Sequence, residues 1–190
     1  MSSGAASLNL IVKNPDEDLH LVKKAIDGNR DAFKELFMKH VSRINSLCLR
    51  ISADSYVAEE LTQEVFIKAW QKLKTFQFES KFSSWLHSIA VNQFLMHLRT
   101  VKRASQRDEK YMTGKEESYS GHQQGSSQDS RIDLEKAITK VPDQARAVLV
   151  LHDIEGYKHI EISKFMNIQV GTSKAHLHRA RKILREELSK

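Results

Sequence analysis

The sequence contains few of the residues that cross-link a chain or interrupt its helices. Its 190 residues include one cysteine, Cys48, two prolines and seven glycines. A single cysteine excludes an internal disulfide and any zinc site built from several cysteines, so we expect a cytoplasmic protein. No apolar run is long enough to span a bilayer, and the short run at residues 8–12 follows no basic segment of the kind that begins a secretion signal. We therefore expect no direct membrane insertion.

Two long stretches lack acidic residues altogether. Residues 80–107 and residues 162–185 contain no Asp or Glu, although the chain carries 24 acidic residues in all. Phosphate groups repel carboxylates, so the missing acids favour nucleic acid as a partner at two separate places. The net charge of +6 by itself would fit a ribosome or an anionic membrane equally well.

Apolar residues recur at helical spacing through most of the chain, and no segment sustains the alternation of a strand. Residues 16–103 divide into four helices, with breaks at residues 28–29, 52–55 and 77–81. At the second break, Asp54 and Ser55 can cap the helix that follows. Residues 104–130 are rich in Ser, Gln and Gly and predict a flexible linker. Helical spacing resumes in residues 131–190. We expect an all-α protein of two small helical domains joined by this linker, after an N-terminal tail of residues 1–15.

The second domain carries the pattern of a helix-turn-helix. After Gly156, a short helix with Ile160, Ile162 and Phe165 facing inward is followed by a turn over residues 167–171 and a second helix capped by Thr172. In such a motif the exposed N-terminal residues of the second helix enter a DNA major groove. The residues expected on that surface are Ser173, Lys174, His176, His178 and Arg179, with Arg181, Lys182 and Arg185 further along. The alternative is an ordinary solvated face of an amphipathic helix.

The sequence offers no pattern for catalysis or metal binding. His176 and His178 are two residues apart and point about 200° apart on a helix, whereas a shared metal needs a spacing of four residues. We find no glycine-rich phosphate loop, no nucleophile elbow and no paired carboxylates in an apolar setting. We therefore expect no enzyme activity, no metal and no cofactor.

The first domain has an aromatic loop and an acidic helix. The loop at residues 76–82 sets aromatics among polar residues, an arrangement that can stack an unpaired base. Ordinary burial favours Phe76 and Phe82 as plugs between helices and leaves Phe78 open to either role. The preceding helix has an acidic surface, which DNA would repel and which favours a protein partner. Its residues are Asp54, Glu59, Glu60, Gln63 and Glu64.

Two blocks of sequence lie on either side of the predicted linker, one in each domain. The first is VAEELTQEVFIKAW with SKFSSWLHSIAVN, and the second is VPDQARAVLVLHDIEGYKHIEISKFMNIQVGTSKAHLHRAR. They resemble the second and fourth conserved regions of bacterial extracytoplasmic-function sigma factors. The resemblance implies an alternative sigma factor that binds core RNA polymerase, directs initiation at specific promoters and is held inactive by an anti-sigma factor.

The resemblance also implies roles for individual residues. The helix with Glu60, Gln63, Glu64 and Phe66 would dock on core polymerase. The minus-ten element would be read and held open by Phe78, Lys81, Ser83, Asn92 and Arg99. The minus-thirty-five duplex would bind Thr172, Ser173, Lys174, His176, His178, Arg179 and Arg181. His176 stands where the family usually has arginine, and Ser88 and Ile89 stand where housekeeping relatives carry a tryptophan pair that wedges the duplex open.

Two other functions remain open at this level. A free-standing helix-turn-helix regulator would bind duplex DNA tightly without polymerase. An enzyme of nucleic-acid metabolism would need a catalytic constellation, and the sequence does not provide one.

Overall fold

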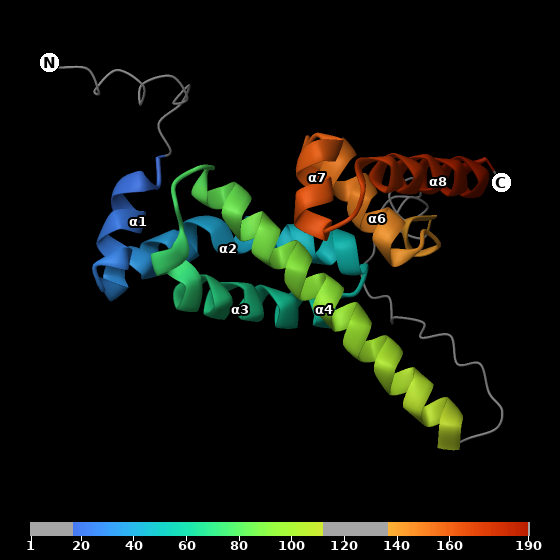
Figure 1. Cartoon of the computed structure of the whole chain (residues 1–190), viewed down its shortest axis with the longest axis horizontal. Helices are drawn as coiled ribbons and strands as arrows, with labels where there is room; N and C mark the ends of the chain where they lie inside the picture. Colours follow the sequence, from blue (N-terminus) through green and yellow to red (C-terminus); the bar gives the residue numbers. More distant parts are fainter. Residues whose placement is uncertain (1–16, 112–136, 190) are drawn as a thin grey trace, which may run out of the picture.

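The computed structural model of the chain describes residues 17–111 and 137–189, so the predicted tail and most of the predicted linker lie outside the described residues. Within these ranges all regular structure is helical (Figure 1). The first domain consists of α1 (Leu19–Ile26), α2 (Arg30–Ser52), α3 (Ser55–Lys72), the 3₁₀ turn η1 (Leu73–Thr75) and α4 (Phe82–Tyr111). The second consists of a helical turn at residues 137–139, α6 (Asp143–Leu149), the π-helical turn η2 (Val150–Ile154), α7 (His159–Met166) and α8 (Val170–Leu188). The expected all-α fold is confirmed.

Side chains at the helix starts explain several boundaries. The Asn29 amide oxygen accepts a hydrogen bond from the Ala32 N–H at 3.0 Å, and the Asp54 carboxylate accepts one from the Val57 N–H at 3.0 Å. These bonds satisfy backbone donors that have no partner inside the helix. Between α2 and α3, Ala53 adopts a left-handed conformation with a φ of 56°, which ends α2. The helix boundaries expected at residues 28–29 and at Asp54 are confirmed.

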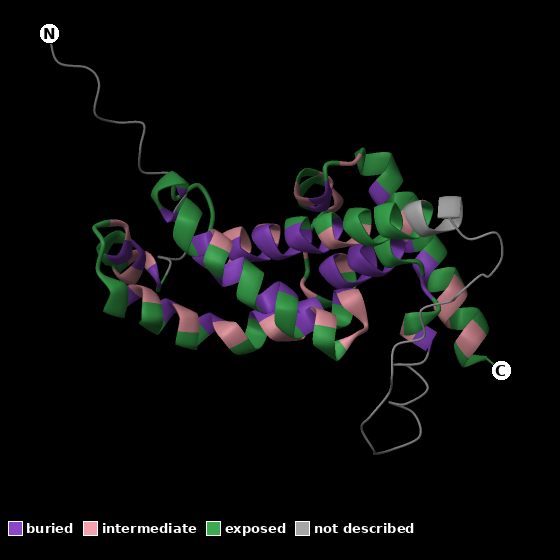
Figure 2. Ribbon diagram, turned by 90° about the horizontal axis from the view of Figure 1, so that it is seen from below, coloured by how far each residue is buried: buried purple, intermediate pink, exposed green. Residues whose placement is uncertain are grey.

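The core of the first domain forms where the apolar faces of α2, α3 and α4 meet. Buried residues recur along the facing sides of these helices in Figure 2. The large side chains that are almost fully buried there are Leu36, Ile44, Leu47, Ile51, Leu73, Phe82, Leu86 and Phe94. Each burial of this kind stabilises the fold by about 1.5–3 kcal/mol relative to an exposed side chain. This layer holds the surfaces of α3 and α4 in fixed orientations.

α4 is longer than the sequence predicted. It continues through Tyr111, whereas we expected the helix to end near Arg103 and a flexible linker to begin at residue 104. Residues 104–111 contain neither Gly nor Pro, and five of their residue types, Ala, Gln, Arg, Glu and Lys, are good helix formers. Helix propensity therefore extends α4 beyond the point at which apolar spacing stops.

In the second domain, α7 and α8 form the expected helix-turn-helix, and α6 packs beside α8. Asn167 adopts a left-handed conformation that ends α7. Two details correct the sequence-based expectation. Ile160 is 58% exposed, because it lies about 200° around the helix from the buried Ile162. Thr172 lies inside the first turn of α8, whose N-cap position is Gln169, so Thr172 does not cap the helix.

The two domains lie directly against each other. α6 and η2 pack on α2, and α7 packs on α4 (Figure 1). The buried apolar residues of both domains form one continuous cluster, so the interface between the domains is part of the hydrophobic core.

Candidate nucleic-acid and protein interfaces

The outer side of α3 carries the acidic surface that the sequence predicted. Glu59, Glu60, Gln63 and Glu64 are all exposed. Glu60 and Glu64 are four residues apart and therefore point in nearly the same direction. A surface of carboxylates repels nucleic acid and complements a basic protein surface.

Phe66 does not belong to this acidic surface. Its side chain is only 5% exposed, and its ring packs edge-on against Phe37 with the centroids 4.8 Å apart. The expectation that Phe66 belongs to the partner-binding surface is therefore wrong, because packing against Phe37 buries its ring between α2 and α3. Ile67 and Trp70, which are 49% and 41% exposed, lie on the acidic side instead. Counting 100° per residue from Glu60 would have identified them from the sequence.

The loop between η1 and α4 separates buried from exposed aromatics. Phe76 and Phe82 are buried, and their ring centroids lie 5.9 Å apart. Phe76 also contacts Trp85, with 5.2 Å between the ring centroids. These two phenylalanines plug the junction between the helices, as burial statistics predicted. Phe78 is 42% exposed and rests on Phe76 with 4.9 Å between the centroids.

The backbone holds Phe78 in an unusual conformation. Its φ of 58° lies in the left-handed region, which is uncommon for a bulky residue. Strained residues of this kind concentrate at ligand-binding sites, where the surrounding structure enforces them. Lys81, three residues later, is exposed. An exposed aromatic ring beside a cation can hold a base and its phosphate.

One side of α4 gathers exposed polar and cationic residues. Asn92 donates a hydrogen bond from its amide nitrogen to the Ser88 carbonyl oxygen at 2.8 Å, which uses one of its two N–H groups. Arg99 is two turns away and points nearly the same way. Ser83 is only partly exposed and lies about 180° around the helix from Asn92, so the structure does not bring it to this surface. Met96 and Arg103, which the sequence analysis did not assign, share the side of Asn92 and are exposed.

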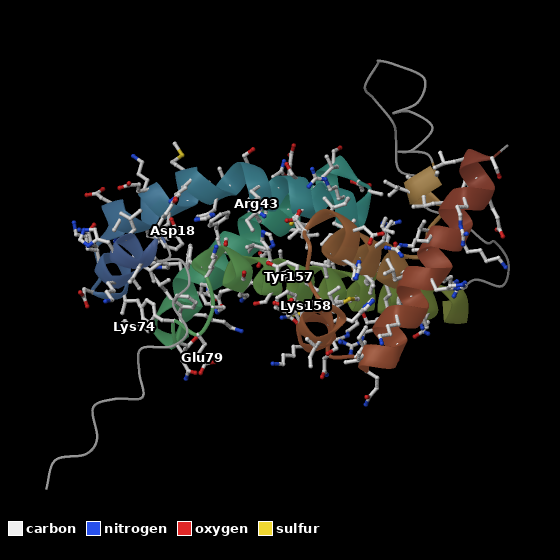
Figure 3. All side chains as sticks on the ribbon, turned by 90° about the horizontal axis from the view of Figure 1, so that it is seen from above. Asp18, Arg43, Lys74, Glu79, Tyr157 and Lys158 are labelled. Carbon is white, nitrogen blue, oxygen red and sulfur yellow. The ribbon has the colours of Figure 1, made fainter. Side chains whose placement is uncertain are left out.

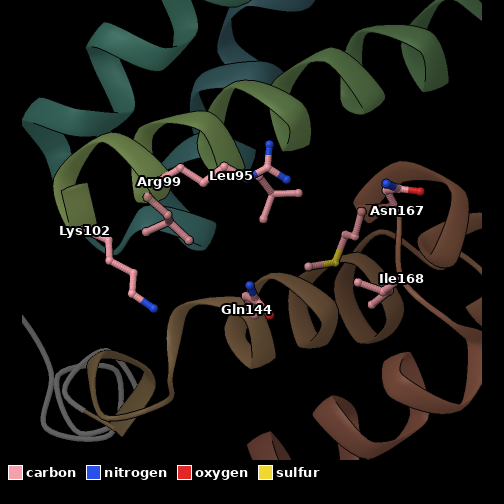
Figure 4. Close-up of a pocket in the computed structure, with 8 residues that line it drawn as sticks. Leu95, Arg99, Lys102, Gln144, Asn167 and Ile168 are labelled. Atoms are coloured by element: carbon pink, nitrogen blue, oxygen red, sulfur yellow. The ribbon is translucent and has the colours of Figure 1, made fainter.

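Arg99 also borders a pocket between the two domains. The pocket measures about 220 Å³ and is lined from α4 by Leu95, Leu98, Arg99 and Lys102, and from the second domain by Gln144, Met166, Asn167 and Ile168. Figure 4 shows the α4 side chains facing those of the second domain across this space. A residue predicted to contact promoter DNA therefore faces the second domain in this arrangement.

The exposed surface of α8 is strongly basic. The face opposite the buried Leu177 and Ala180 is centred on Ala175, His178, Arg179 and Lys182, all of which are exposed. Lys174 and Arg181 flank this face on one side, and Thr172 and His176 flank it on the other. The expected basic surface is present and includes Lys182.

Ser173 is not part of the α8 surface. It is fully buried, and its hydroxyl is hydrogen-bonded to a ring nitrogen of His159 in α7 at 2.9 Å. The expectation that Ser173 is exposed for DNA contact is therefore wrong. The His159 ring in turn stacks on His152, with 4.6 Å between the centroids. Ser173 thus ties α8 to α7 and orients the basic helix.

The charges of two predicted DNA-contacting residues of α8, His176 and Arg181, are affected by their surroundings. Burial, and to a lesser extent the charge of Arg179, lowers the pKa of His176 below its usual 6.5. Arg181 donates two hydrogen bonds to the Asp153 carboxylate, at 3.0 Å from Nε and 2.6 Å from Nη2. The positive charge of Arg181 is therefore partly balanced by Asp153, while Lys174 and Arg179 are exposed cations.

Two kinds of feature are absent from the described part of the chain. Residues 17–111 and 137–189 contain no group of three or more His, Cys, Asp or Glu side chains that could hold a metal ion. In these same ranges, no helix has both the length and the apolar character needed to cross a bilayer.

Family models match both domains. A model described as Sigma-70 region 2 matches residues 36–104, and one described as Sigma-70, region 4 matches residues 131–184. The chain is 32% identical over 181 residues to the ECF RNA polymerase sigma factor SigW of Bacillus subtilis, which covers 88% of this chain and 94% of that protein. It is 34% identical over 163 residues to the ECF RNA polymerase sigma factor SigE of Mycolicibacterium smegmatis, which covers 84% of this chain and 62% of that protein.

Solved structures show the same fold. The sigma factor RpoE of Bartonella quintana, solved in complex with the anti-sigma factor NepR, superposes with a TM-score of 0.64 at 25% identity, covering 83% of this chain and 96% of that chain. CnrH, solved in complex with the cytosolic domain of CnrY, superposes with a TM-score of 0.60 at 22% identity, covering 90% of this chain and 97% of that chain.

Proposed function

The chain belongs to the extracytoplasmic-function (ECF) family of RNA polymerase sigma factors, and we propose that it uses two different surface chemistries for the two tasks of that family. It directs promoter-specific initiation by core RNA polymerase. The observation that carries the proposal is the separation of an acidic, partly apolar face on α3 from basic, acid-free faces on α4 and α8. The working units are residues 16–111, which include the added length of α4, and residues 131–190.

The α3 face is the proposed polymerase-binding surface. Glu60, Gln63 and Glu64 would pair with a basic surface of core polymerase, while Ile67 and Trp70 would supply apolar contact beside them. Aromatic residues surrounded by polar ones are typical of the residues that carry most of the energy of an interface. Phe66 supports this surface from inside the core.

The exposed side of α4 and the loop before it form the proposed minus-ten surface. Phe78 would stack on an unpaired base, Lys81 would neutralise its phosphate, and the amide group of Asn92 would hydrogen-bond a base edge. Arg99 would contact the phosphate backbone about 10 Å further along α4, given a rise of 1.5 Å per residue.

The basic face of α8 is the proposed minus-thirty-five surface. Lys174, His178 and Arg179 would lie at or in the major groove, with Thr172, His176 and Arg181 at its edges. Ser173 acts from behind, through its hydrogen bond to His159.

The remaining properties follow from the family. The chain has no catalytic role of its own and works in the cytoplasm, where bacterial RNA polymerase and the chromosome are found. An anti-sigma factor is a further partner, and the support for it is the Bartonella quintana neighbour, which was solved with one.

We expect Phe78→Ala and Asn92→Ala each to weaken binding to a pre-melted minus-ten fragment, presented with core polymerase, by about 1–3 kcal/mol. Loss of the ring or of the amide removes contacts to the unpaired bases. The measurement is fluorescence anisotropy with a labelled single-stranded fragment. Binding of the minus-thirty-five duplex serves as the control and should be unchanged. Equal affinity of both variants and the wild type for the melted fragment would refute the assignment.

The affinity for the minus-thirty-five duplex should rise as the pH falls from about 8 to about 6. In the free protein the pKa of His176 lies below 6.5, so the ring is mostly neutral at pH 7. A neighbouring phosphate raises the pKa in the complex, so binding takes up a proton and strengthens below the pKa of the bound state. His176→Arg should bind more tightly at pH 8 and remove most of the slope. His178 could produce a similar pH dependence, so the slope is also measured in His178→Gln, where it should persist. An unchanged slope in His176→Arg would show that His176 does not contact phosphate.

Direct association with polymerase tests the function as a whole. When the pure chain is mixed with core RNA polymerase and separated by size-exclusion chromatography, it should elute with the polymerase. A chain that binds duplex DNA tightly on its own and never elutes with polymerase would be a free-standing regulator instead.

A further inference from the structure

An ion pair in the second domain holds one of the cations of the basic α8 surface. Arg181 donates a hydrogen bond from Nε to Oδ2 of Asp153 at 3.0 Å and another from Nη2 to Oδ1 at 2.6 Å. The planar guanidinium matches a carboxylate in this two-bonded geometry, which fixes the orientation of both groups. Asp153 belongs to η2 and Arg181 to α8, so the pair connects two separate elements.

The carboxylate of the pair is held from a second side. Nδ1 of His152 is hydrogen-bonded to Oδ1 of Asp153 at 2.7 Å. The His152 ring stacks on His159, which is in turn hydrogen-bonded to the buried Ser173 of α8. The hydrogen bond from Arg181 is the main cause that lowers the pKa of Asp153, so the carboxylate is charged at pH 7. The partner of Arg181 is therefore an ionised and well-supported group.

The connection from η2 to α7 keeps Asp153 in place relative to the helix-turn-helix. Tyr157, labelled in Figure 3, lies in this short connection. Its ring packs edge-on against Phe165 of α7, with 4.9 Å between the centroids. Its backbone N–H donates a hydrogen bond to the Leu151 carbonyl oxygen of η2 at 2.9 Å. These contacts tie η2 to α7, so Asp153 does not follow Arg181 if that side chain turns elsewhere.

The pair leaves Arg181 with donors that point in one direction. A guanidinium has five N–H groups, and Asp153 accepts from two of them, so three remain that point away from the carboxylate. The Arg181 side chain is 52% exposed and lies at the edge of the basic face. Because its fork is fixed, these donors reach a phosphate only when α8 lies in one register on the duplex.

An unrestrained cation at the same place would help DNA binding at any sequence. Phosphate contacts carry no sequence information, and they supply essentially all of the affinity for random DNA. A mobile Arg181 would turn to the nearest phosphate of any duplex and add to that affinity. The Asp153 carboxylate competes with phosphate for the same donors. It therefore withholds Arg181 from a duplex that is not bound in register.

We propose that Asp153 is a positioning residue that sets the DNA specificity of α8 by holding Arg181. It keeps the binding of random DNA weak and lets Arg181 contribute at the promoter element. This role rests on the proposed function, because it requires that α8 binds the minus-thirty-five duplex. A chromosome offers a vast excess of random sites, so the ratio between the two affinities matters more than either affinity alone.

The affinities of the full chain for two labelled duplexes test this role, with fluorescence anisotropy as the measurement. One duplex carries the minus-thirty-five element of a mapped start site, and the other has the same bases in shuffled order. At about 50 mM salt, Asp153→Ala should bind the shuffled duplex about three- to tenfold more tightly, with a salt slope steeper by about 0.9, the value for one more phosphate. Its affinity for the promoter duplex should change less, so discrimination falls.

A second substitution shows whether the gain comes from Arg181. In the wild-type background, Arg181→Ala should hardly change the affinity for the shuffled duplex, because the cation is already withheld. Added to Asp153→Ala, it should cancel both the gain and the steeper salt slope. A gain that survives Arg181→Ala would overturn the role of Asp153.

Glu186→Ala is the matched control, because it removes the same charge from an exposed residue of α8. Its carboxylate lies 3.8 Å from Lys182, so its loss frees no closely hydrogen-bonded cation. An equal gain in this control would mean that overall charge determines the affinity, and it would overturn the specific role of Asp153.

The remaining outcomes separate this role from the fold and from the proposed function. An exposed ion pair contributes little to stability, so circular dichroism of Asp153→Ala should match that of the wild type. Asp153→Asn keeps the shape without the charge, should show the same gain, and decides the matter if Asp153→Ala unfolds. Unchanged or weaker binding of the shuffled duplex by the folded variant would overturn the role. A wild type that binds both duplexes equally would contradict the proposed function, whereas the response of the shuffled duplex still shows whether Asp153 withholds Arg181.

Discussion

Replacing both Glu60 and Glu64 with lysine should abolish stable binding to core RNA polymerase. The two carboxylates are exposed one turn apart on α3 and would face a basic surface. Like charges placed across an interface cost several kcal/mol, and each 1.4 kcal/mol is a tenfold change, so we expect a loss of at least about 100-fold. The measurement is the dissociation constant for core polymerase by biolayer interferometry, together with circular dichroism to show that the helices remain.

The matched control for this prediction is Asp27→Lys with Glu35→Lys. Both residues are exposed, belong to the same domain and give the same change of charge, but Asp27 follows the last residue of α1 and Glu35 lies on α2, away from the α3 helix. This control should bind polymerase as the wild type does. If the α3 variant and the control lose affinity equally, overall charge rather than the α3 face determines binding.

Phe82→Ala should destabilise the first domain by about 3–5 kcal/mol, the usual cost of removing a fully buried aromatic ring. Phe82 is 0% exposed, and its ring contacts Phe76, Trp85 and His40, with centroid distances of 5.9, 5.6 and 5.6 Å. The loss leaves a cavity at the junction of the helices. Thermal denaturation followed by circular dichroism measures the effect.

Phe78→Ala is the control for the aromatic loop. Its ring is 42% exposed, so its removal should change the melting temperature little while it weakens capture of the unpaired bases. A large fall in melting temperature for Phe78→Ala would make Phe78 part of the plug. A small fall for Phe82→Ala would mean that the junction does not depend on the ring.

Local features of the fold could be predicted from the sequence because their causes are local. Asn29 and Asp54 mark helix starts through hydrogen bonds to backbone groups three residues away. The exposed charges of α3 and α8 follow from helical spacing. The end of α4 was missed because apolar spacing stops before helix propensity does. Ser173 was misassigned because residue type was weighed without the angle around the helix, which places it on the inner side. Phe66 was misassigned because its burial depends on Phe37 of α2, which helical spacing within α3 does not show.

The contact between the domains could not be predicted in the same way. Arg146 reaches a carbonyl 95 residues away, and Glu155 reaches Arg50 across 105 residues. The sequence around each of these residues resembles the sequence around an ordinary charged residue on a protein surface. Only the arrangement in space shows that both are buried and that each is satisfied by the other domain.

Promoter-directed transcription with purified components tests the account most directly. The full chain is added to core RNA polymerase and chromosomal DNA of the same bacterium, and the 5′ ends of the transcripts are mapped. We expect discrete start sites that are absent with core polymerase alone and that are lost with Glu60→Lys and Glu64→Lys combined. Transcripts whose start sites are the same with and without the chain would contradict the conclusion that it directs promoter-specific initiation.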